Sequence, residues 1–367
     1  MHDKGLIVDS KFLISGGRNI GDGYFGRYSK TDSGETLPIF EDSDVLVLES
    51  KAVNDAAGYF DDLWNSKFVS IPRLYDYSKE QLASDYCRYQ ENGRDNDTLE
   101  CESRQKYYIK EVLDEEKKFE KFIITYKTQQ AEAQYYALDW AAQGIIVSNV
   151  EFLHDDVKTQ KSNLDKPEKN VAARLYEVIS NAKKHVIIVS PYLVITPEHE
   201  ALFKKLKEKN VKVQIFTNSK ASNDGPAAYV GYEKSRHIAL NQGAEIYEYQ
   251  GPDTLHAKMV FVDDQTLFIG SYNWDYRSQN LNREVGILAT LPENPEHHLN
   301  VEIFDKISRI IRNSCRTDGS SCVPTSNIRL ADVTEEQMQR LIELNKRREE
   351  KSSKVFRIFY SIIKEQL

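Results

Sequence analysis

The residues of this chain best suited to chemistry on a phosphate gather between Thr254 and Gly286. His256 and Lys258 lie two positions apart in an alternating apolar stretch, so on a β-strand both side chains leave the same face. A group that binds a phosphate and attacks it from one side requires that arrangement. Glu284 follows His256 by 28 residues and is placed to orient an imidazole. This stretch therefore predicts a site that handles phosphate.

Small and polar residues follow the next apolar run. Gly270 lets backbone amides approach an anion, and the side-chain amide of Asn273 can donate to one. Ser271 has the type of a nucleophile, but the pattern places no base near it. A hydrogen bond from Ser271 to phosphate or to the backbone is the better interpretation.

The amino-terminal segment repeats this pattern. HDKGLIVDSKFLISGGRN, His2 to Asn19, aligns without a gap with HAKMVFVDDQTLFIGSYN, His256 to Asn273, at a constant offset of 254. Seven of the 18 positions are identical, which indicates a true internal repeat. The first copy supplies a second histidine and a second lysine, Lys4, and has Gly17 where the second copy has Ser271.

Reaction at a phosphodiester makes three demands on a site. It needs a nucleophile, a proton for the poor alkoxide leaving group, and positive charge for the phosphorane oxygens. The two repeats supply two histidines, two lysines and two asparagines, and these meet all three demands. We therefore expect neither a metal nor a cofactor.

The pattern H-x-K-x4-D-x6-G-S-x-N resembles the active-site motif of the phospholipase D superfamily, with six identities at fixed offsets. Further runs resemble the bacterial cardiolipin synthase branch: GGRNIGDGYF, DSDVLVLES, FDDLWNS, SPYLV, TNSKASND and LHAK. The likeness covers nearly the whole chain and thins between about residues 67 and 165.

The resemblance implies an α/β fold of two phospholipase D-like half-domains, each a mixed, mostly parallel sheet flanked by helices. Their half-sites would meet across a pseudo-twofold axis. About 90 residues, 167–255, precede the second motif, whereas the first motif starts at residue 2. We therefore expect an incomplete first half-domain, as in a chain truncated at its amino terminus.

The resemblance also implies roles for the motif residues. His2 would attack phosphorus to give a phosphohistidine, and His256 would protonate the leaving alcohol. Lys4 and Lys258 would clamp the phosphate oxygens.

Carboxylates are expected to hold the imidazoles. Glu284 is predicted to orient His256, and Asp44, which follows His2 by 42 residues, is predicted to orient His2. Asp9 and Asp263 belong to the motif but are interpreted as structural residues that fix its geometry. The expected phosphate-binding set comprises Gly16, Gly17, Asn19, Gly270, Ser271 and Asn273.

Other polar residues carry weaker signals. The remaining histidines, His154, His185, His199, His237, His297 and His298, show no ligand spacing, and solvated or capping roles suffice for them. Tyr192 and Arg236 would touch a lipid head group or serve the fold, and the sequence leaves both open.

Periodicity predicts the elements that carry the site. In the first half we expect strands over 5–9, 11–15 and 45–48, and a helix over 52–64. In the second half, helices over 171–183, 197–209 and 229–241 precede apolar strands over 186–192, 211–217 and 244–249. Strands over 259–262, 267–269 and 285–289 complete a largely parallel sheet covered on both faces.

These elements predict four segments. Residues 1–66 would be the remainder of the first half-domain, and 67–165 a helical linker or insertion. Residues 166–330 would be the second half-domain, and 331–367 a helical tail. The polar run NLDKPEKN, 163–170, marks the central boundary.

Charge and hydropathy bound the partners. The 367 residues carry a net charge of −8, and such an acidic chain is a poor prior for nucleic-acid binding. No apolar run reaches the roughly 18 residues of a membrane span. We expect a phospholipid substrate, phosphatidylglycerol or a related lipid, and peripheral association with the bacterial inner membrane.

Two further features bear on location. Cys87 with Cys101 and Cys315 with Cys322 are predicted disulfides, which favours an extracytoplasmic face; chance clustering in a reducing cytoplasm is the alternative. The tail 354–367 is amphipathic and suits either a membrane interface or packing on the core.

Three classes of function fit these observations. A phospholipid phosphodiesterase or phosphatidyltransferase leads; a phospholipase D-type endonuclease and a catalytically incomplete interaction protein are the alternatives. The acidic balance and the lack of a basic, aromatic-interleaved patch count against the nuclease. The sequence leaves hydrolysis and transfer open, because the choice depends on whether water or an alcohol reaches the phosphohistidine.

Overall fold

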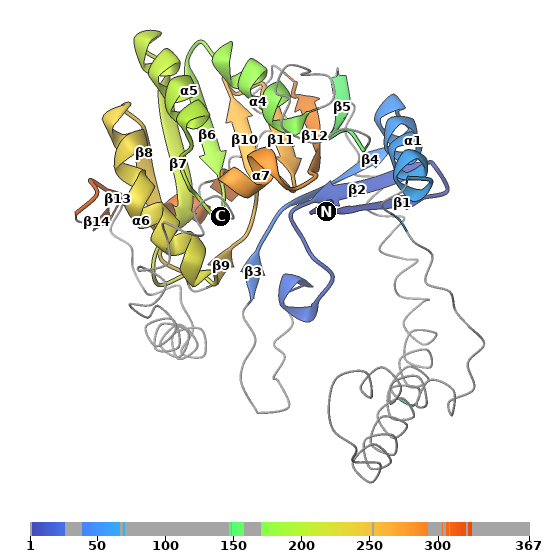
Figure 1. Ribbon diagram of the computed structural model, residues 1–367, viewed down its shortest axis with the longest axis horizontal. Helices are drawn as coiled ribbons and strands as arrows, with labels where there is room; N and C mark the ends of the chain where they lie inside the picture. The colour runs from blue at the N-terminus through green and yellow to red at the C-terminus, as the bar shows by residue number, and fades with distance from the viewer. Residues whose placement is uncertain are drawn as a thin grey trace, which may run out of the picture. The chain divides into compact units, whose positions relative to one another are not determined.

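The computed structural model describes residues 2–25, 39–66, 149–157, 170–251, 253–292, 309–320 and 322–324, with a few single positions between them. The described elements belong to one compact unit formed by Met1–Ser66 and Val147–Leu367 (Figure 1). The tail 331–367, Cys87, Cys101 and nearly all of 67–146 lie outside the described residues. The expectations about them remain predictions.

A nine-stranded mixed sheet forms the centre, in the order β14-β13-β8-β7-β6-β10-β11-β12-β5. Its strands are β5 Asn149–His154, β6 His185–Val189, β7 Lys212–Asn218, β8 Glu245–Tyr249, β10 Met259–Val262, β11 Thr266–Gly270, β12 Val285–Thr290, β13 Ser314–Thr317 and β14 Cys322–Pro324. In this sheet the pairs β6–β7 and β7–β8 are parallel, and the other six described pairs are antiparallel. The sheet is therefore less parallel than the sequence suggested.

Strand β6 shows why the sheet is covered on both faces. Val186 and Ile188 join one apolar cluster, and the alternate residues Ile187 and Val189 join another on the opposite face. Helices α4 Val171–Ser180, α5 Pro197–Glu208 and α6 Pro226–Asn241 carry residues of the first cluster and lie over that face (Figure 1). Since successive side chains of a strand alternate, an all-apolar strand requires two such layers.

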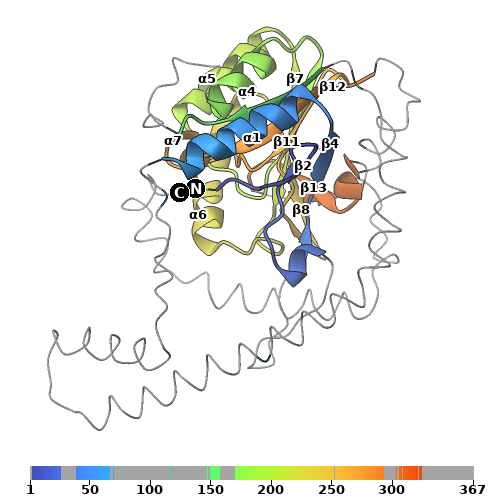
Figure 2. The same ribbon diagram turned by 90° about the vertical axis from the view of Figure 1, so that its right-hand side faces the viewer.

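The first half contributes a three-stranded antiparallel sheet, β1-β2-β4, and helix α1. Its elements are β1 Gly5–Val8, β2 Phe12–Gly16, β4 Asp44–Leu48 and α1 Lys51–Trp64. Leu13 of β2 and Val53 of α1 pack in one cluster with Ile287 of β12, so the two halves share a core. Figure 2 shows α1 lying alongside these strands.

Short elements connect the halves near the motif histidines. β3, Phe40–Glu41, pairs in parallel with β9, Thr254–Leu255, directly before His256. The 3-10 helix Asp22–Phe25 also contacts β3. The small helix α7, Tyr276–Asn280, follows the second motif. A mixed α/β fold with two halves, as the resemblance implied, is thus confirmed.

One detail departs from the sequence expectations, and another agrees with them. β5 falls in the expected linker, yet it pairs along its whole length with β12 and forms an edge of the large sheet. Cys315 is disulfide-bonded; β13 places it beside β14, which begins at Cys322, a residue whose side chain is not among those described.

Asp263 serves the fold at the turn between β10 and β11. Its carboxylate accepts the backbone N–H groups of Lys183, Lys184 and His185 at 2.8, 2.7 and 3.0 Å. Partial burial acts to raise the pKa of Asp263, but these three amides outweigh it and hold the pKa below its ordinary 3.8. Asp263 therefore ties the start of β6 to this turn, in agreement with its expected structural role.

Asp9 offers a matched control, because Asp9 and Asp263 share a left-handed backbone, with φ of 51° and 53°. Asp263→Ala should lower the free energy of unfolding by about 2 kcal/mol more than Asp9→Ala does, since only Asp263 loses charge-assisted hydrogen bonds. A depressed pKa stabilises the fold above the unfolded value, so the difference should be full at pH 7 and shrink below about pH 4. Urea unfolding at both pH values measures it; equal losses for the two variants would contradict the assignment.

Candidate active site

His2 and His256 are held at equivalent places before β1 and β10. The backbone N–H of His2 donates to the carbonyl of Arg283 at 3.0 Å, and that of His256 donates to Glu41 at 2.8 Å. Each histidine is therefore fixed by main-chain bonds to the opposite half. This arrangement brings both imidazoles to the junction between the halves.

Glu284 holds His2. Nδ1 of His2 lies 2.9 Å from Oε2 and 3.2 Å from Oε1 of Glu284. The Glu284 side chain is fully buried, and Ser271 and Ser278 donate their hydroxyl protons to it, Ser278 at 2.7 Å. Three hydrogen-bond partners to one buried carboxylate fix its position.

Asp42 holds His256. Nδ1 of His256 lies 2.6 Å from Oδ2 of Asp42, and the Asp42 side chain is fully buried. The other oxygen of this carboxylate accepts the backbone N–H of Ser43 at 2.8 Å. Each imidazole therefore has a carboxylate on Nδ1, which leaves Nε2 as the nitrogen for chemistry.

The pairing of carboxylates with histidines differs from the sequence prediction. Glu284 orients His2 rather than His256, and Asp44 does not contact His2 but binds the Arg18 guanidinium. The reason is the junction itself: each carboxylate lies just before a strand of its own half, Asp42 before β4 and Glu284 before β12, and contacts the imidazole of the other half. Separation along one repeat cannot reveal such an exchange.

Strand register explains why Asp42 was missed. Gly16 on β2 lies opposite Asp44 on β4, and Gly270 on β11 lies opposite Gly286 on β12. Glu284 lies two residues before Gly286, the partner of Gly270. In the same way, Asp42 lies two residues before Asp44, the partner of Gly16. Asp42 is therefore found by counting back from the strand partner of Gly16, and not by counting forward from His2.

The difference between Gly17 and Ser271 follows from the length of these carboxylates. A Cβ atom added at Gly17 would lie 2.1 Å from Oδ1 of Asp42, so a serine does not fit there. In the second half the longer Glu284 leaves room for Ser271, whose hydroxyl donates to it. The Ser271 hydroxyl also accepts the backbone N–H of Val285 at 3.0 Å, so the hydrogen bond to the backbone that the sequence left open is present.

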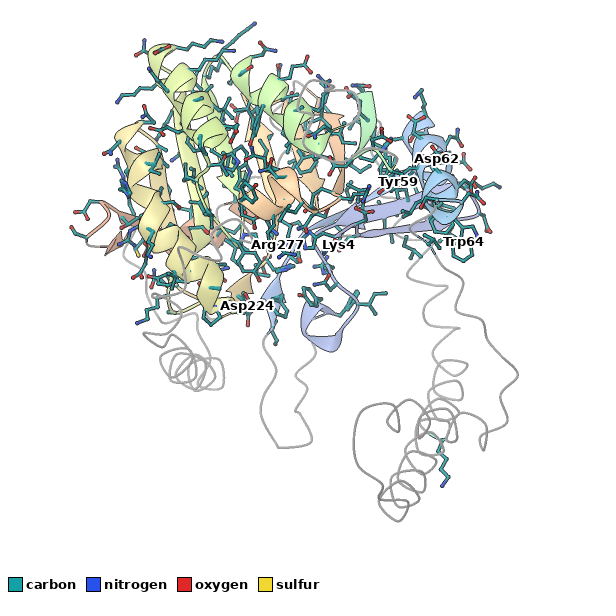
Figure 3. All side chains as sticks on the ribbon, in the orientation of Figure 1. Lys4, Tyr59, Asp62, Trp64, Asp224 and Arg277 are labelled. Carbon is teal, nitrogen blue, oxygen red and sulfur yellow. The ribbon has the colours of Figure 1, made fainter. Side chains whose placement is uncertain are left out.

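The two lysines take equivalent positions beside the histidines. Lys4 Nζ donates to the carbonyl of His2 at 3.0 Å, and Lys258 Nζ donates to that of His256 at 2.5 Å. Lys4 lies where the first-half strands approach the second half (Figure 3). Lys258 is completely buried, and this burial lowers its pKa to about 8. Burial likewise lowers the pKa of Lys4.

His256 is the more enclosed imidazole. Its side chain is 5% exposed, against 27% for His2. Burial lowers the pKa of His256, the nearby Lys258 ammonium lowers it further, and the bond to Asp42 acts in the opposite direction. The net lowering makes the His256 imidazolium a stronger acid than an ordinary one.

Aromatic rings enclose His256 from the side. The centroids of Tyr24, Phe40 and Tyr192 lie 5.1, 5.3 and 6.4 Å from that of His256, all in edge-on geometry. The Tyr192 hydroxyl donates to Asp224 at 2.8 Å. Sequence analysis raised only Tyr192, since nothing in the pattern of Tyr24 and Phe40 distinguishes them from core residues.

The remaining predicted residues divide by position. Asn273 is buried, and its Oδ1 has no hydrogen-bond partner among the described residues. Asn19 is exposed and donates to the Tyr24 hydroxyl at 2.8 Å, so the two asparagines are not equivalent. Arg236 pairs with Glu248 at 3.0 Å, a contact that serves the fold. Within the described residues, no group of three or more His, Cys, Asp and Glu side chains is arranged to hold a metal ion.

The exchange of carboxylates gives a sharp test. Asp42→Asn should lower kcat/KM for a phosphodiester by about 10²- to 10⁴-fold, because it removes the charge and fixes the wrong tautomer of His256. Asp44→Asn should lower it less than about tenfold, since Asp44 contacts Arg18 instead. Steady-state assays with thermal melting as a folding control measure both; a larger loss for Asp44→Asn would contradict the pairing.

Comparison with protein families supports the reading of the motif. Residues 175–307 match the family described as the phospholipase D-like domain of cardiolipin synthase. The chain is 28% identical over 309 residues to cardiolipin synthase C of Escherichia coli K12, covering 78% of this chain and 58% of that protein. It is 27% identical over 297 residues to cardiolipin synthase 1 of Bacillus cereus, covering 81% of this chain and 44% of that protein. The chain thus spans about half the length of these relatives.

A solved structure shares the fold. The phosphatidylserine synthase of Haemophilus influenzae Rd KW20 superposes with a TM-score of 0.55 at 15% identity, covering 100% of this chain and 71% of that chain. At this identity the likeness shows the fold alone. Within the described residues, no helix is both long and apolar enough to span a membrane.

Proposed function

The chain belongs to the phospholipase D superfamily, and from this premise we propose that it is a phospholipid phosphodiesterase or phosphatidyltransferase of the cardiolipin synthase type, acting through a phosphohistidine. The observation that carries the proposal is the pair of imidazoles, each held at Nδ1 by a carboxylate of the other half. Such a pair provides a nucleophile and an acid on opposite sides of one phosphorus atom.

In the first step, Nε2 of His2 attacks phosphorus. Glu284 accepts a hydrogen bond from Nδ1–H of His2 and stabilises the positive charge that develops on the ring, which keeps this proton. His2 suits this role because it is the more accessible imidazole. The bond from phosphorus to the alcohol oxygen breaks, and His256 supplies the proton that this oxygen takes up.

In the second step, His256 accepts a proton from the incoming water or alcohol, whose oxygen attacks phosphorus and releases His2. Lys4 and Lys258 stabilise the phosphorane oxygens as negative charge develops there. Because Lys258 is buried, its charge acts through a low effective dielectric and a bound phosphate keeps it protonated.

The substrate class follows from the relatives. The names of two relatives, cardiolipin synthase C and cardiolipin synthase 1, indicate transfer of a phosphatidyl group. We extend that class to this chain, with phosphatidylglycerol or a related lipid as the phosphatidyl donor. Such a lipid resides in a bilayer, so the chain would act at a membrane surface as a peripheral protein.

The division of labour between the histidines can be tested by trapping. During turnover of a p-nitrophenyl phosphodiester, a quench in alkaline denaturant, which preserves the acid-labile P–N bond, should leave the substituted phosphoryl group on His2. His256→Asn should still accumulate this adduct because p-nitrophenolate needs no proton. His2→Asn should abolish the adduct and lower turnover by several orders of magnitude. Peptide mass spectrometry locates the phosphate; an adduct on His256 would reverse the two roles.

The pH dependence tests the acid independently. With a poor leaving group, kcat/KM should fall as pH rises through the pKa of His256, which burial and Lys258 place below the ordinary 6.5. With p-nitrophenolate as the leaving group this alkaline limb should disappear, because no proton is required. If both substrates showed the same alkaline limb, His256 would not be the acid.

A further inference from the structure

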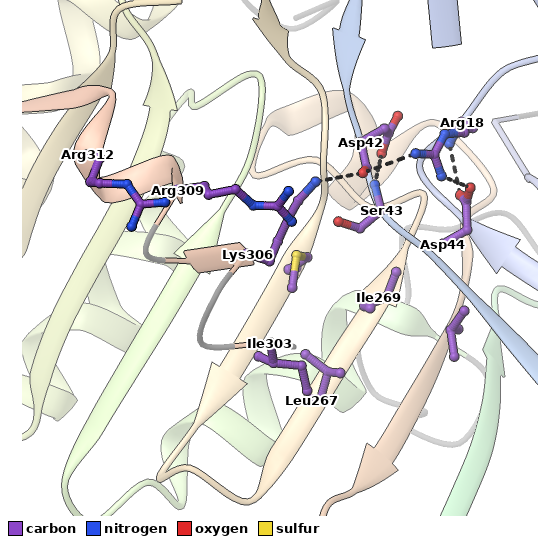
Figure 4. Close-up of a pocket in the computed structure, with 12 residues that line it drawn as sticks. Arg18, Asp42, Ser43, Asp44, Leu267, Ile269, Ile303, Lys306, Arg309 and Arg312 are labelled. Atoms are coloured by element: carbon purple, nitrogen blue, oxygen red, sulfur yellow. Dashed lines mark hydrogen bonds and ion pairs between the residues drawn. The ribbon is translucent and has the colours of Figure 1, made fainter. Parts of the chain in front are cut away.

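A cavity of about 650 Å³ is lined in part by Asp42, and neither motif histidine is among its lining residues. We call it the basic pocket, because four of its twelve lining residues are cations: Arg18, Lys306, Arg309 and Arg312 (Figure 4). Its volume falls within the roughly 300–1,000 Å³ typical of ligand pockets.

The charges of the basic pocket do not cancel. Its lining contains four cations and two carboxylates, Asp42 and Asp44, a balance of 4 − 2 = +2. Arg18 binds Asp44, and Lys306 binds Glu41. The chain as a whole carries a net charge of −8, so this local excess runs against its overall balance.

Arg309 and Arg312 are the cations that remain. Both are exposed, and among the described residues neither guanidinium has a carboxylate within ion-pair distance. In Figure 4 they continue the row that starts at Arg18 and Lys306. Two guanidinium groups that line a cavity without an acidic partner are donors suited to a phosphate group.

Packing fixes where these arginines lie. Residues 309–312 and Lys306 are helical, and the spacing of three places Lys306, Arg309 and Arg312 on one helical face. Ile307 and Ile310 on the other side of this helix are buried in the apolar cluster beneath the sheet. The row of cations is therefore anchored to the core.

The rest of the wall is apolar. Met259 of β10, Leu267 and Ile269 of β11, Val45 of β4 and Ile303 line the basic pocket. Met259, Leu267, Ile269 and Ile303 are largely buried in the core, so only the small part of each that faces the pocket is open. The end of an acyl chain would cover this remaining apolar area, which a free phosphate ion would not. Cations beside an apolar wall match a ligand that is anionic at one end and hydrocarbon at the other.

We propose that the basic pocket binds an anionic phospholipid, with its phosphate on Arg309 and Arg312 and part of an acyl chain on the apolar wall. The site is separate from the motif histidines but touches their support: Lys306 Nζ donates to the backbone carbonyl of Asp42 at 2.8 Å, and the Asp42 side chain holds His256. A lipid in the basic pocket would thus lie beside Lys306, which hydrogen-bonds to Asp42, the residue that positions His256.

The test measures binding rather than turnover, so it succeeds or fails independently of the proposed function. The probe is monomeric dihexanoyl-phosphatidylglycerol carrying a photoreactive diazirine at an acyl end. Irradiation followed by peptide mass spectrometry should label the peptides that carry Leu267, Ile269 or Ile303. Label confined to other peptides would overturn the proposal.

Matched variants separate this site from non-specific attraction. Arg309→Gln with Arg312→Gln should reduce pocket labelling at sub-saturating probe by about 10- to 100-fold, the loss of two charge-assisted hydrogen bonds. Lys204→Gln with Lys205→Gln removes the same charge from the exposed side of α5 and should change labelling less than about twofold. Arg309→Lys with Arg312→Lys should restore part of it; equal losses in the two glutamine pairs would overturn the site.

Competition distinguishes the source of the phosphate. Unlabelled dihexanoyl-phosphatidylglycerol should protect the pocket at concentrations at least about tenfold below those of glycerol 3-phosphate, because only the lipid buries hydrocarbon. Dihexanoylglycerol, which lacks the phosphate, should protect poorly. Equal protection by glycerol 3-phosphate would make this a free-phosphate site, and equal protection by dihexanoylglycerol would make it an apolar one; either result would refute the proposal.

Discussion

The exchange of carboxylates across the junction is the interaction on which the rest of the site depends. Glu284 of the second half holds His2 of the first, and Asp42 of the first half holds His256 of the second. Among the described residues, neither motif histidine has its orienting carboxylate within its own half. The two halves must therefore associate before either histidine has a defined tautomer, and their shared core at Ile287 makes that association part of folding.

Burial at this junction creates the electrostatics of the site. Lys258 and Asp42 are both fully enclosed, so each charge requires an opposite charge or a hydrogen-bonding partner. The same enclosure lowers the pKa of Lys258 and His256. An anion close to Lys258 and His256 would favour their protonated forms, because its negative charge opposes the lowering of both pKa values.

Asp42 also joins two regions that otherwise face different ways. Its side chain supports His256, while its backbone carbonyl accepts a hydrogen bond from Lys306 in the basic pocket. Its carboxylate further fills the space that a side chain at position 17 would need. Asp42, on a short connecting segment, thus excludes a side chain at position 17, orients the His256 imidazole and lines the basic pocket.

The sequence by itself identified the two histidine–lysine motifs, because the ungapped repeat of His2–Asn19 and His256–Asn273 fixes residue types at fixed offsets. It also determined most strands and helices, since their apolar periodicity reflects burial next to the chain itself. Only the tertiary structure decided which carboxylate serves which histidine, that Ser271 holds Glu284, and that Asp42 matters at all. Those contacts join positions more than 200 residues apart or depend on strand register, and neither leaves a local pattern in the sequence.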